Sequence, residues 1–489
     1  MKLLMARLKE DFSCRDEKFN DIILQSFVIG LFIFLSVFWK WFSIVPLIFV
    51  SAFTLHYRNG KSLYYLLFLL PLMSIFKFNT NGSYLLTIAV VIVLAILSLQ
   101  LIVDILKKKK KINWFFSIMF AIVIIYFSLP FSFPSLSIWG SLILGCALLF
   151  VSYYYWNDLN LKELILIFGF GMLFSVVIGI FLPLSSRLLK MISQYSALGF
   201  YRYSGAAENV NVFAGELMIA FSLFTFLFIK KEINLLYYPV YLLCAVLLTL
   251  TLSKSALIIF LVINLWLFAS VWFKFKAKKS LIILAVVVGL YSLTFAMFPN
   301  KNVAYWCRLL NISYTRHLPE VEPPKVEEPE EDKEDEVTPG KTDQQILSEL
   351  TTGRTEIWKQ YLDKILESPK SILFGYGVGA ESVGKFGALE NCSSHNTYLQ
   401  CVYYVGIVGI GIIILWLLSI VNFKKIKKLD VFSFIVPISV ALFLFGLDFF
   451  SFRLGNYMLL IFSVLMKKDE KTEVLDKEGK EDEKNLENV

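Results

Sequence analysis

Apolar stretches close to twenty residues long recur along almost the whole chain, and each contains few charged residues. A helix of about twenty such residues can cross a hydrocarbon core of roughly 30 Å. The pattern therefore predicts an all-α polytopic membrane protein with about 12–14 transmembrane helices. The expected spans are 22–39, 42–57, 62–78, 83–106, 113–129, 136–156, 161–181, 212–229, 235–251, 254–273, 279–298, 397–421, 431–449 and 451–466.

The composition excludes a soluble protein. Hydrophobic residues make up 57% of the 489 positions, and aromatic residues make up 16%. A soluble protein of this length cannot bury so much apolar surface, because its surface-to-volume ratio leaves too much of it in water. Residues 1–21 are charged and the first apolar run is long enough to remain as an anchor, so no cleavable signal peptide is expected.

Lysine clusters between the spans predict the topology. Short basic loops stay on the cytoplasmic side of a membrane. Spans that alternate from an inside amino terminus place all of these clusters inside: 107–111, 230–231, 274–279, 424–428 and 467–468. The net charge of +8 is therefore expected to reflect membrane topology, and no nucleic-acid partner is expected.

The same topology predicts how the chain is divided. A cytoplasmic amino terminus (1–21) precedes transmembrane helices over 22–298, which include an outer loop at 183–211. A large extracytoplasmic loop (299–396) contains an acidic insert at 318–343, and transmembrane helices over 397–466 and a disordered cytoplasmic tail (467–489) complete the chain. The insert is expected to be disordered, because residues 320–336 hold ten acidic side chains, two lysines and three prolines and can bury little apolar surface.

Two further features lie in the large loop. Residues 355–367 have apolar side chains at helical spacing, which predicts an amphipathic helix on the membrane surface or against the spans. The run from Gly375 to Gly379 has glycine at every second position. Such a run can cradle phosphates, but the pattern is unspecific and favours a flexible turn.

Charged and polar residues gather on the expected outer side. Glu216, Lys254, Asp448 and Arg453 fall in or at the ends of spans, and Arg202, Glu208 and His395 stand just before spans. A transporter more often places such groups near the bilayer midplane, so the pattern favours chemistry at the outer leaflet. Each residue also has a purely structural interpretation. Lys254 can extend its charge to the interface, Arg202 can pair with Glu208, Arg354 can be an exposed loop charge, and His395 can be a hydrogen-bonding group at a helix start.

Three stretches resemble the O-antigen ligase and polymerase family of bacterial membrane enzymes. The first is Arg202-Tyr203-Ser204-Gly205 followed by Asn211-Val212-Phe213-Ala214, and the second is Thr249–Ala256, which contains Ser253-Lys254. The third combines Gly353-Arg354 and Trp358 with Phe374-Gly375-Tyr376-Gly377, Ser394-His395-Asn396-Thr397-Tyr398 and Gly406. The family usually has arginine where this chain has Lys254, and lysine lacks the bidentate fork that suits phosphate oxygens.

The resemblance implies a glycosyltransferase C-like fold and a metal-independent glycosyltransferase without a cofactor, in the plasma membrane of a bacterium. Its donor would be a saccharide linked to polyprenyl pyrophosphate, such as undecaprenyl pyrophosphate, and its acceptor a hydroxyl of a glycan, a lipid or the cell wall. His395 is the expected catalytic base, because a helix start disfavours the protonated ring. Expected binding residues for pyrophosphate and glycan are Arg202, Lys254, Arg354, Asn211 and Asn396.

The sequence leaves the exact activity open. A polymerase of a capsule or O-antigen-type polysaccharide is favoured. A ligase that moves a finished glycan onto a lipid or cell-wall acceptor is the alternative within the family. A flippase for lipid-linked oligosaccharides is the alternative from another class, and a polar cavity at the midplane would favour it.

Overall fold

The computed structural model describes 2–13, 17–39, 42, 44–57, 60–72, 85–129, 136–181, 203, 205–206, 210–251, 253–275, 354–380, 394–421, 426, 429–445 and 452–466. Within these residues all regular structure is helical, so the chain is an all-α polytopic membrane protein, as its sequence predicts. The expected span at 279–298, the acidic insert at 318–343 and the tail after 467 lie outside the described residues.

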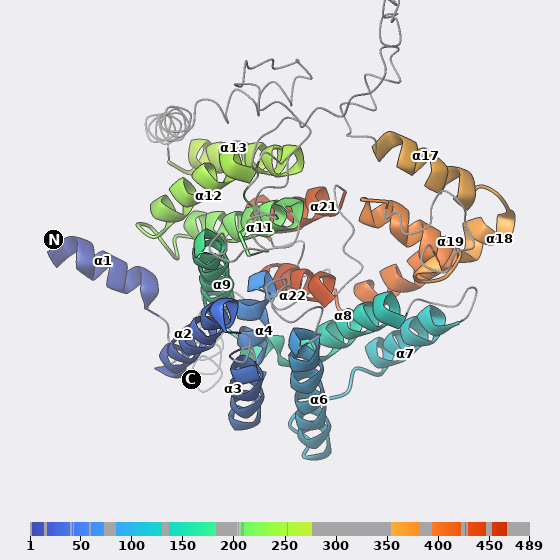
Figure 1. Ribbon diagram of the computed structural model, residues 1–489, viewed down its shortest axis with the longest axis horizontal. Coiled ribbons are helices and arrows are strands. Elements are labelled where there is room, and N and C mark those ends of the chain that lie inside the picture. The colour runs from blue at the N-terminus through green and yellow to red at the C-terminus, as the bar shows by residue number, and fades with distance from the viewer. Residues whose placement is uncertain are drawn as a thin grey trace, which may run out of the picture.

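The amino-terminal half begins with a short helix, α1, and continues as apolar helices (Figure 1). Their bounds are α1 Lys2–Phe12, α2 Glu17–Phe38, α3 Ile44–His56, α4 Leu63–Leu69 with the 3-10 turn η2 Leu70–Leu72, α6 Leu85–Leu106, α7 Trp114–Ser128, α8 Leu136–Tyr155 with η3 Trp156–Asp158, and α9 Leu161–Phe181. The first apolar helix therefore begins at Glu17, five residues before the expected span at 22–39.

The later helices follow the predicted spans closely. Their bounds are α11 Val210–Ile229, α12 Tyr237–Thr251, α13 Lys254–Phe275, α17 Arg354–Ile365, α18 Pro369–Phe374, α19 Thr397–Leu418, η7 Val431–Phe434, α21 Ile435–Phe445 and α22 Phe452–Met466. Across the described residues, 6 helices are long and apolar enough to cross a membrane, and the other apolar helices are shorter.

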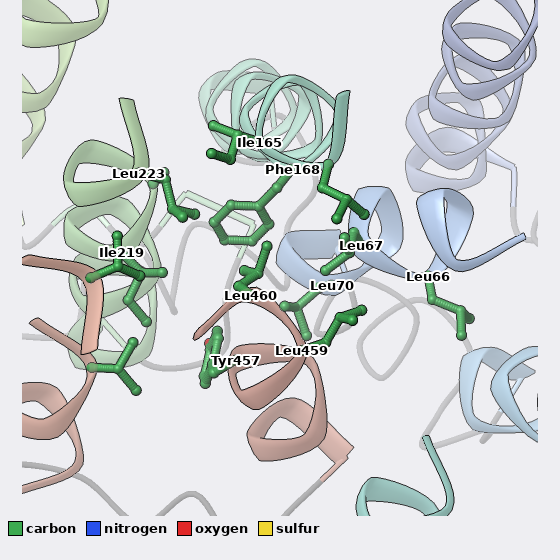
Figure 2. Close-up of a cluster of buried hydrophobic side chains, with 14 of the residues drawn as sticks. Leu66, Leu67, Leu70, Ile165, Phe168, Ile219, Leu223, Tyr457, Leu459 and Leu460 are labelled. Carbon is green, nitrogen blue, oxygen red and sulfur yellow. The ribbon is translucent and has the colours of Figure 1, made fainter. Parts of the chain in front are cut away.

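α11 is the central helix of the bundle. In its most apolar stretch, 89% of the residues are buried. The helix packs against α9, α12, α13 and α21. Figure 2 shows one apolar cluster in which side chains from α4, α9, α11 and α22 meet. Backbones approach closely here, since a Cβ on Gly171 would lie 2.3 Å from the Phe68 carbonyl oxygen. Moving an apolar side chain out of lipid gives membrane helices little hydrophobic driving force. Their association therefore depends on close packing of this kind.

α17, α18 and α19 lie together at one end of the molecule (Figure 1). α19 is broken inside its length, because Gly406 has φ 60° and ψ −173°. The carbonyl groups before such a break lose their helical donors, and lipid cannot replace them.

Donors from other segments bond to the carbonyl oxygens at this break. The backbone N–H of Tyr376 donates to Tyr403 (2.8 Å), and that of Gly377 donates to Tyr404 (2.9 Å). The hydroxyl of Tyr126 in α7 donates to Val405 (2.9 Å). The glycine-rich run after α18 is thus a turn, as predicted, and it is hydrogen-bonded to the broken helix.

Glycine is required where the two backbones meet. Gly375 has φ 69° with ψ −167° and Gly406 has φ 60° with ψ −173°, a region that is almost confined to glycine and costs other residues about 1–3 kcal/mol. A Cβ on Gly375 would lie 2.5 Å from the Tyr404 carbonyl oxygen, and a Cβ on Gly406 would lie 2.4 Å from that of Leu373. Any side chain at either position would separate the turn from α19.

Candidate active site

His395 sits in a tight turn immediately before α19. Its φ is 52°, a left-handed conformation that is uncommon for a residue with a side chain. Both neighbours hold this turn in place. The Ser394 hydroxyl donates to the Asn396 carbonyl oxygen (2.8 Å) and accepts the Asn396 N–H (3.2 Å), while the Ser394 N–H donates to Oε1 of Gln400 (3.1 Å). Such a conformation persists only where its surroundings determine it, and this arrangement is typical of functional sites.

Asn396 caps the start of α19. Its side-chain oxygen accepts the backbone N–H groups of Tyr398 (3.0 Å) and Leu399 (3.1 Å). The residue is 6% exposed. The structure therefore gives this predicted binding residue a capping role behind the histidine, while His395 itself is half-buried.

α17 also holds the histidine turn in place, through a hydrogen bond. Nε1 of Trp358 donates to the carbonyl oxygen of Ser394 at 2.8 Å. Trp358 belongs to a stripe with Arg354, Tyr361 and Ile365, at positions i, i+4, i+7 and i+11 of the helix. Tyr361 is fully buried, with its ring 4.8 Å from that of Tyr403 in α19. The amphipathic helix predicted at 355–367 is therefore present and packs against a span.

Arg354 is the first residue of α17 and is half-buried. It lies one helical turn before Trp358 on the stripe that faces α19. The structure thus brings this predicted binding residue to the side of α17 that supports the His395 turn.

The other candidate residues lie around the start of α11 and the turn between α12 and α13. Arg202 lies outside the described residues, but its neighbour Tyr203 donates its N–H to the Leu250 carbonyl oxygen (2.9 Å). The Tyr203 hydroxyl donates to the Val176 carbonyl oxygen in α9 (2.6 Å). The chain that follows Arg202 is therefore fixed against the ends of α9 and α12.

Lys254 and Asn211 both lie at helix starts. Lys254 is the first residue of α13, and two residues separate it from the end of α12. Asn211 is the second residue of α11 and is half-buried. A helix start carries unpaired N–H groups and partial positive charge, which favours anions.

α21 connects the two groups of candidates. It packs against α11, α13 and α19 (Figure 1). The hydroxyl of Tyr398, the second residue of α19, donates to the Ala441 carbonyl oxygen of α21 (3.0 Å). Two residues further along α21, the Phe443 ring occupies the place where a Cβ of Gly215 in α11 would stand. The histidine end of α19 and the start of α11 therefore contact the same short helix.

Residues 239–414 match the family model of the O-antigen ligase. This chain carries an O-antigen ligase domain. The match confirms the resemblance that the sequence motifs indicate. No curated protein and no solved structure matches the chain significantly.

The O-antigen ligase domain runs from α12 into α19. It includes Lys254, Arg354, His395 and Asn396, whereas Arg202 and Asn211 precede it. It also includes the break at Gly406 and the turn that bonds to it. Among the described residues, no three His, Cys, Asp or Glu side chains form a group that could hold a metal ion.

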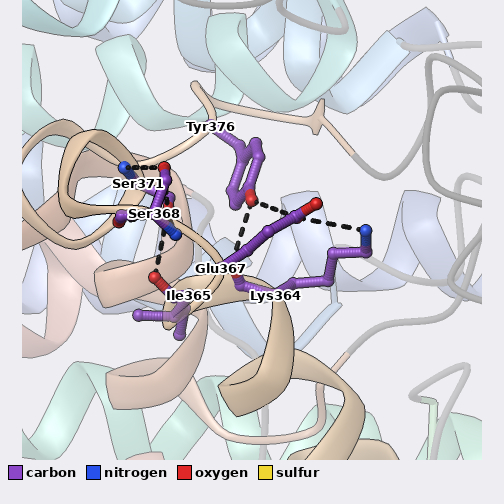
Figure 3. Close-up of polar contacts among 6 residues, drawn as sticks. All are labelled: Lys364, Ile365, Glu367, Ser368, Ser371 and Tyr376. Atoms are coloured by element: carbon purple, nitrogen blue, oxygen red, sulfur yellow. Dashed lines mark hydrogen bonds and ion pairs between the residues drawn. The ribbon is translucent and has the colours of Figure 1, made fainter.

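The junction of α17 and α18 is a compact polar unit of the O-antigen ligase domain (Figure 3). Ser368 caps α18 through a reciprocal pair of hydrogen bonds with Ser371. The Tyr376 hydroxyl lies 2.9 Å from the Lys364 carbonyl oxygen and 2.8 Å from Oε2 of Glu367. The hydrogen bond with Tyr376 is the main cause that lowers the pKa of Glu367, and the neighbouring Lys364 is the second cause. Burial is the main cause that raises the pKa of Tyr376, and the neighbouring Glu367 is the second cause.

Sequence reasoning missed the residues that hold the histidine. Trp358 stands within the family motif, yet its acceptor lies 36 residues away in the chain. Gln400 is a polar residue one turn into a predicted span, and it is 2% exposed. A buried amide at that depth needs a hydrogen-bond partner. The short spacing between Gln400 and Ser394 was therefore the signal that could have predicted their bond.

Proposed function

We propose that the protein is a membrane glycosyltransferase that polymerises a capsule or O-antigen-type polysaccharide. The O-antigen ligase domain supports the joining of glycans in a membrane. The donor in this proposal is a saccharide linked to polyprenyl pyrophosphate, and the acceptor is a sugar hydroxyl. The observation that carries the proposal is the His395 turn, because an ionisable side chain is held there in an uncommon backbone conformation.

In the proposed reaction, the neutral imidazole of His395 takes the proton of the acceptor hydroxyl. The hydroxyl oxygen attacks the anomeric carbon, and the bond from that carbon to the pyrophosphate oxygen breaks. The leaving pyrophosphate keeps the electron pair, so it needs fixed positive charge nearby. Arg202, Lys254 and Arg354 are the proposed sources of that charge.

The geometry supports this division of roles in two ways. Arg354 lies on the stripe of α17 whose Trp358 bonds to the histidine turn. The backbone next to Arg202 is bonded to Leu250, four residues before Lys254. Asn211, at the start of α11, and Asn396, behind the histidine, are the proposed polar contacts to the glycan.

The proposed topology places the lysine clusters in the cytoplasm and the 299–396 loop outside. Its support is that all five clusters fall on one side when the spans alternate. Labelling of a cysteine introduced at Thr338 with an impermeant thiol reagent tests this placement. The residue should react in intact spheroplasts, and reaction only after lysis would reverse the topology.

Substitution of the histidine tests the function. His395→Ala and His395→Gln should both stop glycan transfer while donor binding and protein level stay normal. His56→Gln is the matched control, because His56 is an exposed residue at the end of α3, and this variant should keep full activity. Normal polymer from His395→Gln would exclude the base and leave the histidine a positioning role.

Two alternatives have distinct outcomes. In a deletion strain, single lipid-linked repeat units should accumulate if the protein is a polymerase, whereas long chains on lipid would identify a ligase. A flippase would remain active in Arg202→Ala and Lys254→Ala variants, both of which should be inactive here. Lys254→Arg should stay active, because it keeps the charge and adds the bidentate fork.

A further inference from the structure

α1 has an apolar face that is largely exposed in the described part of the protein. Leu4, Leu8 and Phe12 follow one another at four-residue intervals, and Met5 lies beside them. Leu4 is 51% exposed, Met5 61% and Phe12 53%. α1 also extends away from the other helices (Figure 1). Such an apolar face of an amphipathic helix requires a partner.

The carboxyl-terminal end of α1 is fixed to the helix bundle. Asp11 is 4% exposed, and its carboxylate accepts the N–H groups of Asn234 (3.0 Å), Leu235 (2.8 Å) and Leu236 (3.1 Å), just before α12. Nζ of Lys162, at the start of α9, donates to the Ser13 carbonyl oxygen (3.2 Å). α1 is therefore held where α9 and α12 begin, and the remainder of the helix projects from that point.

This location is beside the start of an apolar helix long enough to span a membrane, and it is rich in positive charge. α2, an apolar helix long enough to span, begins at Glu17, soon after α1 ends. Lys162, Lys230 and Lys231 belong to the same end of the bundle, and α1 adds the exposed residues Arg7 and Lys9. Anionic lipid headgroups are attracted to basic side chains beside a membrane helix.

We propose that α1 lies on the membrane surface and binds an anionic phospholipid layer. Its face of Leu4, Met5, Leu8 and Phe12 enters the boundary between headgroups and acyl chains. Arg7 and Lys9 lie outside that face, where they contact phosphate groups. A second copy of the chain would cover the same apolar face but would not need the basic surroundings.

The full-length protein in vesicles tests the proposal. An environment-sensitive fluorescent amino acid is placed at Leu4 in one variant and at Leu3 in the matched control. Leu3 is also exposed, at 68%, but the helical spacing places it between Arg7 and Glu10, away from the apolar face. The vesicles contain phosphatidylcholine with or without phosphatidylglycerol.

In vesicles with phosphatidylglycerol, we expect the probe at position 4 to resist aqueous iodide several-fold better than the probe at position 3. A spin-labelled lipid should quench position 4 more strongly. Equal iodide quenching at the two positions would overturn the proposal. Protection that disappears on dilution of protein in lipid would assign the face to a second copy, and equal protection without phosphatidylglycerol would overturn the anionic preference.

Discussion

The hydrogen bond from Trp358 to Ser394 should control how well His395 is positioned. Trp358→Phe keeps most of the aromatic surface and removes the single N–H donor. The donor atom lies 2.8 Å from the carbonyl oxygen, and Ser394 is fully buried. A buried acceptor that loses its partner costs about 1–3 kcal/mol. The His395 turn would bear this cost, because the carbonyl group belongs to the residue directly before His395.

The expected kinetic effect follows from that free energy. If the left-handed turn is destabilised by about 1.4 kcal/mol relative to other conformations, the ratio of competent to other conformations falls about ten-fold. Transfer in membranes from defined donor and acceptor should then show a lower kcat, by up to about ten-fold. The donor KM should be unchanged, because the phosphate-binding charges are untouched. Product formation and donor dependence, measured at equal protein level, give the two parameters.

Trp416→Phe is the matched control for this experiment. Trp416 lies in α19, is 3% exposed, and stacks on Phe116 with ring centroids 5.7 Å apart. Its Nε1 has no hydrogen-bond partner among the described residues. The control should lose packing but keep activity. Equal losses of activity in the two variants, or full activity in Trp358→Phe, would refute the positioning role.

Three further predictions concern stability. Gly406→Ala should lower the free energy of unfolding by about 2 kcal/mol or more, from backbone strain and a clash, whereas Gly411→Ala in the same helix meets nothing within 4 Å and should be neutral in thermal melts. Asp11→Ala should cost about 2 kcal/mol, because three N–H groups lose their acceptor, and the exposed neighbour variant Glu10→Ala should melt like the parent. Glu367 has a pKa lowered from its ordinary value of 4.5, so its contribution is present above that pH and is lost on acidification; the difference in melting temperature between the parent and Glu367→Gln should shrink as pH falls below 4.5.

The helices were predictable because each span is a long apolar run, and such runs leave a membrane chain few other conformations. The break in α19 was not. Gly406, Gly409 and Gly411 look alike in the sequence, and glycine is common in membrane helices. Gly406 is distinguished by its positive φ and by the approach of the Leu373 backbone, and both depend on tertiary packing.

The candidate site was predictable in its residue types but not in its supports. His395 and Arg354 stand out because both lie in stretches that resemble the O-antigen ligase and polymerase family. Trp358 does not stand out, since a tryptophan on a helical stripe is as often a packing residue. Its acceptor is a backbone carbonyl, which carries no signal in the sequence. The amphipathic pattern of α1 lies within residues 1–21, a segment whose predicted position rests on its charge alone.

The half of α19 before its break has both of its ends attached to the same neighbouring unit. At its start, Trp358 of α17 bonds to the carbonyl group of Ser394. At its end, the turn after α18 bonds to Tyr403 and Tyr404. α17 and α18 are themselves joined by the polar junction around Tyr376. The segment that carries His395 is therefore fixed relative to α17, and hence relative to Arg354, in addition to its bonds to α7 and α21. A break in a membrane helix normally leaves carbonyl groups without partners, and here the same bonds that satisfy those groups also fix the distance between the proposed base and a proposed phosphate-binding charge.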